Sequence, residues 1–166
     1  MKDETERVSP RLDEEALSLS LFDGMDAATR RKICDSARTL ILAEGERLFH
    51  RGEMPQGLHF LLSGQVGLYQ SDATGKEVIA EVIDTGGVFL LAAALTRKPY
   101  LLSGVALSSS SVLELPVDAV HRLLHEQPDF AIAMLIWLSE RYRTHIQEIG
   151  ALSDALESRL FPGRIG

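Results

Sequence analysis

The chain has 166 residues, of which 45% are hydrophobic and 25% are charged, a balance typical of one globular domain. Its formal net charge of −7 repels a phosphate backbone, so we expect no DNA binding by this chain alone. No apolar run approaches the roughly 18 residues that a membrane span needs, and the acidic N-terminus contains no secretory signal. We therefore expect a cytoplasmic protein that does not associate with membranes. Cys34 is the single cysteine of the sequence, so an internal disulfide is excluded. We expect Cys34 to lie on a helix and to pack in the protein core.

The first part of the chain is polar and then helical in pattern. Residues 1–11 are expected to be disordered, and residues 12–21 and 26–38 are predicted to form two short helices. Asp26 is the predicted N-cap of the second helix, and Ile33 lies on its apolar face.

From Thr39 onward the sequence consists of short segments that are rich in β-branched and aromatic residues and end in turn signals. These segments cover residues 39–45, 47–53, 57–64, 65–70 and 76–87. A hairpin loop is predicted at 71–76, then a short helix that Pro99 must end, and two further strands around a turn at 108–111. Strands about eight to twelve residues apart indicate a mainly β protein with helices, in the form of a double-stranded β-roll.

Two more helices are predicted, an amphipathic one over 117–126 and a longer one from Asp129. Apolar residues of the longer helix alternate in steps of three and four, which is the a/d seam of a coiled coil. Its expected dimer interface consists of Leu135, Leu138, Tyr142, His145, Ile149, Leu152 and Leu156. A helix packed on its own domain would give a similar pattern. A second apolar set, Ile132, Ile136 and Ile146, lies off the seam and is expected to cover the roll, which favours a homodimer.

The segment 45–69 resembles the signature of the cyclic-nucleotide-binding fold that Crp/Fnr-type transcription regulators share. The matching positions are Gly45, Glu46, Leu48, Phe49, Gly52, Phe60, Leu62, Gly64 and Val66. Glycines permit the tight turns and close backbone approach that a roll of short strands needs. The resemblance extends from about Leu21 to Leu152 and implies a β-roll flanked by N-terminal helices and a long C-terminal dimerisation helix.

In family members that bind cyclic nucleotides, the segment after a pair of glycines cradles the phosphate. A Glu of that cradle holds the ribose, and an Arg followed by Ser or Thr neutralises the phosphate. The resemblance places Leu90 at the usual Gly, Leu91 at the Glu and Leu102 at the Arg, so only Ser103 is retained. Losing the Arg removes a charge-assisted contact worth about 1.5–3 kcal/mol. We therefore expect cyclic AMP and cyclic GMP to bind weakly or not at all.

The effector pocket that the resemblance implies is apolar. Its expected lining is Leu68, Phe89, Leu90, Leu91, Leu102, Ser103, His145 and Ile146. This composition suits a small apolar effector or a flat cofactor such as haem better than a nucleotide. The apolar cradle is similar to that of the regulators of dissimilatory nitrate respiration, and some family members sense nitric oxide through haem. His145 is accordingly a haem ligand, a polar residue satisfied across the dimer, or a partly exposed residue; no motif decides among these.

Other sites carry weaker signals. His121 and His125 are four apart on one helical face, a spacing that fits a zinc site as well as a solvated pair. His59 is predicted to be an exposed strand residue. A cupin-type metalloenzyme shares the roll but would need a His-x-His motif, which the sequence lacks, as it lacks the cysteine cluster of an iron–sulfur sensor. We predict neither a bound metal nor enzymatic activity.

The resemblance divides the chain into an effector-binding roll at 12–127, a dimerisation helix at 128–160 and a tail at 161–166. A winged helix-turn-helix needs several tens of residues, so the DNA-binding half of such a regulator is expected to be absent. The chain is then either a piece of a longer regulator or a stand-alone sensor module that acts through protein partners.

Overall fold

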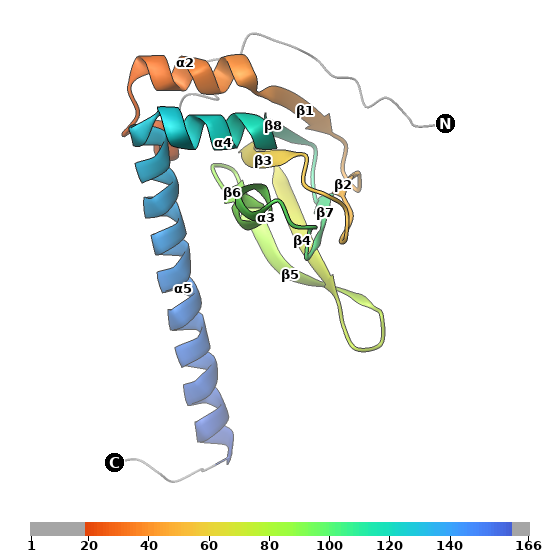
Figure 1. Ribbon diagram of the computed structural model, residues 1–166. Helices are drawn as coiled ribbons and strands as arrows, with labels where there is room; N and C mark the ends of the chain where they lie inside the picture. The colour runs from red at the N-terminus through yellow and green to blue at the C-terminus, as the bar shows by residue number, and fades with distance from the viewer. Residues whose placement is uncertain (1–18, 161–166) are drawn as a thin grey trace.

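Two four-stranded antiparallel sheets form the roll in the computed structural model, which describes residues 19–160 (Figure 1). The first sheet has the order β1 (Arg38–Leu42), β8 (Ser110–Pro116), β3 (Gly57–Ser63) and β6 (Val88–Phe89). The second has the order β2 (Arg47–Phe49), β7 (Ser103–Ala106), β4 (Gln65–Ser71) and β5 (Glu77–Asp84). The helical elements are the 3₁₀ turn η1 (Ser20–Phe22), α2 (Ala27–Ser36), α3 (Leu91–Thr96), α4 (Val117–Glu126) and α5 (Pro128–Leu160). The predicted β-roll with flanking helices is confirmed.

Helix α2 begins where the sequence predicts. The backbone N–H of Thr29 donates to Oδ1 of Asp26 at 2.7 Å, which makes Asp26 the N-cap. The helix ends at Ser36, two residues earlier than expected, because the chain enters β1 at Arg38. Cys34 lies on α2 but is only half-buried, and its partial burial raises the pKa of the thiol. The predictions for 1–11 and 161–166, and most of that for 12–21, lie outside the described residues.

The hairpin between β4 and β5 follows the predicted turn chemistry. Oδ1 of Asp72 accepts hydrogen bonds from the backbone N–H groups of Thr74 and Lys76, at 2.8 and 3.0 Å. Gly75 supplies the positive φ of +84° that closes the turn.

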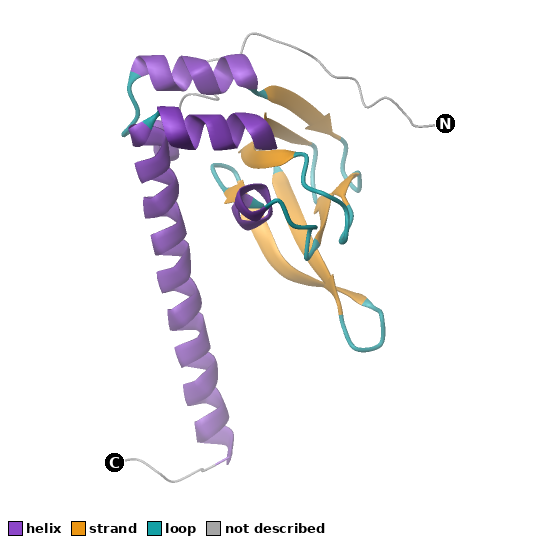
Figure 2. Cartoon of the chain, viewed as in Figure 1, coloured by secondary structure: helices purple, strands orange, loops and turns teal. Residues whose placement is uncertain are grey.

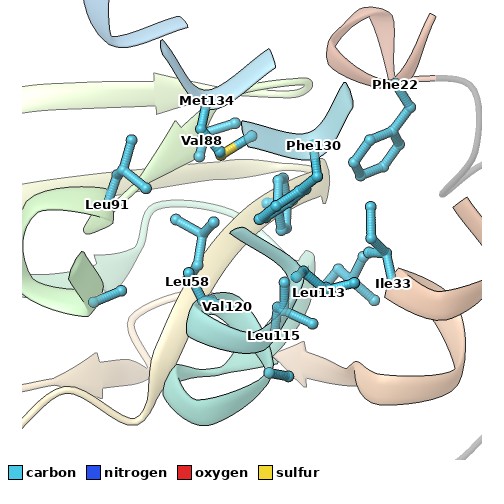
Figure 3. Close-up of a cluster of buried hydrophobic side chains, with 14 of the residues drawn as sticks. Phe22, Ile33, Leu58, Val88, Leu91, Leu113, Leu115, Val120, Phe130 and Met134 are labelled. Carbon is cyan, nitrogen blue, oxygen red and sulfur yellow. The ribbon is translucent and has the colours of Figure 1, made fainter. Parts of the chain in front are cut away.

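Buried side chains form two clusters on opposite faces of the first sheet. Figure 3 shows the first cluster, in which Phe22, Val120 and Phe130 of the helices meet Leu58 and Leu113 of the strands. Helices α2 and α4 contact each other and the first sheet on this side (Figure 2). The second cluster fills the inside of the roll with Leu42, Phe49, Leu61, Val66, Leu68, Ile83, Phe89, Tyr100, Ala106 and Val112.

Strand β3 is buried on both faces, so the prediction that His59 is exposed was wrong. Helices cover one face of β3 and the second sheet covers the other, and His59 is 2% exposed. Alternation identifies an outward residue only in a strand with one face in water.

Helix α5 contributes buried side chains to the core only near its N-terminal end. Phe130 and Met134 are buried in the first cluster, whereas Ile132, Ile136 and Ile146 are 55%, 59% and 51% exposed. The prediction that these isoleucines cover the roll was therefore wrong. Residues two positions apart lie on opposite faces of a helix, and the larger side chains of Phe130 and Met134 occupy the inward face. No helix among residues 19–160 is long and apolar enough to cross a membrane.

Candidate functional site

A cavity of about 440 Å³ opens between the roll and α5. Strands β4 and β5 form one wall, β6 with α3 and the loop after it form a second, and α5 forms the third. Most of the lining is apolar, with Leu68, Ile83, Phe89, Leu91, Leu102 and Trp137 among its larger side chains. Its volume lies in the range of about 300–1,000 Å³ that is usual for small-molecule sites.

The structure brings together most of the predicted effector pocket. Leu68, Phe89, Leu90, Leu91, Leu102 and His145 all line the cavity. Ser103 and Ile146 do not line it, which corrects the prediction for these two residues. Leu102 lies in the bend before β7, whereas Ser103 is the first residue of that strand and is buried away from the cavity. Its Oγ accepts a hydrogen bond from the backbone N–H of Arg51 at 3.0 Å, while Ile146 is turned about 100° from His145 around the helix.

Sequence reasoning missed the wall that β5 contributes and, apart from His145, the residues that α5 contributes. Glu81 and Ile83 come from β5, and Trp137 and Arg141 come from α5. One signal was available, because Trp137 and Arg141 continue the row of Phe130 and Met134 at steps of three and four along one face. The resemblance drew attention to the cradle segment instead.

In the cradle segment, Leu90 adopts a left-handed backbone conformation that is usual for glycine. Leu90 caps the N-terminus of α3 with φ 68° and ψ 16°, in the left-handed region. A non-glycine residue in this conformation costs about 1–2 kcal/mol. The Leu90 side chain packs against the cluster inside the roll and lines the cavity, which offsets that cost. The segment that the resemblance assigns to the cradle therefore begins with a left-handed residue, and Leu90, Leu91 and Leu102 line the cavity.

Helix α3 is tied to α4 at its C-terminal end. His121 Nε2 lies 3.0 Å from the carbonyl oxygen of Ala94, and Arg97 pairs with Asp118 at 2.8 Å. His121 is thus engaged with the backbone of α3. Among residues 19–160, no group of three or more His, Cys, Asp or Glu side chains could hold a metal ion.

The polar groups of the lining are partly exposed. Glu81 of β5 forms an ion pair with Arg141 of α5, and their side chains are 24% and 32% exposed. Nδ1 of His145 lies 3.2 Å from Oε2 of Glu148, one turn further along α5. Lys98, in the loop after α3, is exposed and makes no ion pair within the described part of the chain.

A charged network lies behind the cavity wall, inside the roll. Nε of Arg38 donates to Oε1 of Glu114 at 2.6 Å, and His59 Nε2 lies 3.0 Å from Oε2 of the same carboxylate. Burial raises the pKa of Glu114, but His59 and Arg38 outweigh it and hold that pKa below its ordinary value. The ring of His59 stacks on Phe89 with centroids 5.3 Å apart. The network therefore supports a residue that lines the cavity.

Comparison with known proteins identifies the family. A family model described as the cyclic nucleotide-binding domain matches residues 40–127, more than half of the chain. The chain belongs to this family. The global nitrogen regulator of Synechocystis sp. is 29% identical over 96 residues, which cover 57% of this chain and 43% of that protein. This chain thus matches less than half the length of that regulator.

Solved structures of regulators share the fold. The catabolite activator protein of Thermus thermophilus superposes with a TM-score of 0.70 at 23% identity, covering 80% of this chain and 62% of that chain. The sensor domain of the transcriptional regulator DNR from Pseudomonas aeruginosa gives 0.68 at 26% identity, covering 81% and 91%. The resemblance to Crp/Fnr-type regulators is confirmed.

Proposed function

We propose that this cyclic nucleotide-binding domain is the effector-sensing and dimerisation part of a cytoplasmic Crp/Fnr-type regulator, and that its effector is a small apolar molecule. The leucines at the positions that the resemblance assigns to the phosphate cradle carry the proposal. Leu90, Leu91 and Leu102 all line the cavity, so a cyclic phosphate placed there would be desolvated against apolar side chains at a cost of several kcal/mol. An apolar ligand incurs no such cost.

The dimer is part of the proposal. The residues of the predicted seam are exposed, from 43% at Leu138 to 67% at Tyr142. A single amphipathic helix that extends beyond its domain gains little stability from the domain, because helices depend on tertiary packing. A second copy of α5 would bury these side chains and form a two-fold coiled coil.

Effector and partner would then act on shared side chains. Leu138, Tyr142 and His145 belong to the predicted seam and also line the cavity. A ligand in the cavity therefore contacts residues of the proposed dimer interface directly, which is the physical coupling that an allosteric sensor requires. The output would be a changed arrangement of the two α5 helices, read by DNA-binding domains or by other protein partners.

The effector proposal is tested with the chain's own fluorescence. The sequence contains one tryptophan, Trp137, and it lines the cavity. We expect decan-1-ol to change the Trp137 fluorescence saturably and to raise the midpoint of thermal unfolding, while micromolar cyclic AMP does neither. Ala93→Phe fills the cavity and should abolish the decan-1-ol response, whereas Ala28→Phe on the exposed face of α2 should retain it. A clear midpoint increase with micromolar cyclic AMP would contradict the proposal.

Haem binding is a second candidate, favoured by the contacts of His145. In a histidine that ligates a metal, the second ring N–H usually donates a hydrogen bond to a carboxylate, a backbone carbonyl or water. Here Nδ1 of His145 faces Glu148, and the ring lines the cavity. This leaves Nε2 as the ligand atom. Addition of haemin should shift the Soret band, and His145→Ala should remove the shift whereas His125→Ala, on α4, should not. A shift that survives His145→Ala would exclude this assignment.

A further inference from the structure

The charges of the cavity lining do not cancel. Glu81 and Arg141 neutralise each other in their ion pair, and the ring of His145 faces Glu148. Lys98 remains as a lining cation without an ionic partner among residues 19–160. The lining therefore combines an apolar wall with one surplus positive charge.

Lys98 is more exposed to solvent than the leucines at the positions where family members bind a phosphate. Lys98 is exposed, and so is its neighbour in the lining, Leu101, at 82%. An anion that meets Lys98 keeps part of its water, so its desolvation cost is small. An anion at Leu91 or Leu102 would lose its water to leucine side chains, since Leu91 is 2% exposed. The ligand best matched to this lining has its apolar part inside and its charge at the open edge.

We propose that the cavity binds an amphipathic monoanion, a molecule with an apolar body and a single carboxylate, with the carboxylate at Lys98. The apolar body would contact the leucines and Trp137, and the lysine stem would extend along the apolar surface beside it. This inference rests on the proposed function, because it names the chemical class of the effector.

The test compares two probes that differ only in their head group, decanoate and decan-1-ol. Trp137 fluorescence gives the dissociation constants of both probes for the full chain. The measured quantity is the preference for decanoate, which is the dissociation constant of decan-1-ol divided by that of decanoate. Lys98→Ala should reduce the preference for decanoate about two- to fivefold, the usual effect of an exposed ion pair. The preference should also weaken at high salt. Lys98→Arg should retain it, and Lys32→Ala, an exposed lysine of α2, should leave the ratio unchanged.

The outcomes separate the two proposals. If neither probe changes the Trp137 fluorescence, the apolar-effector function fails. If both probes bind and the ratio is the same in the wild type and in Lys98→Ala, the carboxylate anchor is overturned while the apolar-effector function stands. A ratio that falls in Lys98→Ala but not in Lys32→Ala supports the anchor.

Discussion

Ile149→Asp should turn a dimer into a monomer, and Gln147→Asp, two residues away, should leave the dimer intact. Ile149 is a seam residue and 62% exposed in the single chain. In a two-fold coiled coil its two copies would face each other, so the substitution would bury two like charges in an apolar contact. A buried, unpaired carboxylate costs several kcal/mol, and each 1.4 kcal/mol weakens the dimer tenfold. We expect the dissociation constant to rise at least about a hundredfold.

Sedimentation velocity over a range of concentrations measures this directly. Gln147 lies on the face of α5 opposite the seam, so Gln147→Asp adds the same charge to the same helix without entering the interface. Both positions are exposed in the single chain, and thermal unfolding of the roll should therefore be unchanged by either substitution apart from the contribution of dimerisation. A wild-type chain that stays monomeric at tens of micromolar, or two variants that dissociate equally, would contradict the proposed interface.

The parts of the fold that depend on local chemistry could be predicted from the sequence. Asp26 caps α2 because its side chain reaches a backbone N–H three residues on, and the hairpin of Asp72 and Gly75 depends on residues within one turn. Helix α4 has the predicted bounds of 117–126 because its apolar periodicity is strong and Pro116 precedes it. Each of these signals is complete within a few residues.

The errors concern how elements face each other. The burial of His59 depends on strand residues that are distant in the sequence, such as Phe89 and Glu114. The rotation of α5 depends on whether Phe130 or Ile132 enters the core. Both faces of α5 are apolar, so periodicity alone could not choose between them. The contact between Glu81 and Arg141 joins residues sixty positions apart, and no local pattern reports it.

Removal of the Glu114 side chain is expected to have a large effect on stability. Glu114 is 4% exposed and pairs with Arg38 and His59. Removing one partner of a buried charged pair costs about 3–5 kcal/mol, because the remaining group loses its compensation. We expect Glu114→Ala to lower the free energy of unfolding by this amount, measured by urea denaturation at pH 7. Glu77→Ala, which breaks the exposed pair with Arg47, should cost much less.

A double variant separates the charge from the packing. His59→Phe combined with Glu114→Leu replaces the buried pair by apolar side chains of similar size, an exchange that is often neutral or stabilising. The third member of the network, Arg38, has a side chain that is 35% exposed and keeps contact with water. The double variant should regain most of the stability that Glu114→Ala loses. If it is as unstable as Glu114→Ala, the network contributes through its specific geometry rather than through compensation of a buried charge.

The pH dependence follows from the same carboxylate. Since His59 and Arg38 hold the pKa of Glu114 below its unfolded value despite burial, folding favours the ionised form. The stabilisation is therefore complete above the ordinary pKa of a glutamate, about 4.3, and is lost as the pH falls through the lower pKa of the folded state. The wild type should lose stability more steeply in this acid range than the variant with His59→Phe and Glu114→Leu. Equal slopes in urea titrations at several pH values would show that folding does not lower the pKa of Glu114, which would contradict this prediction.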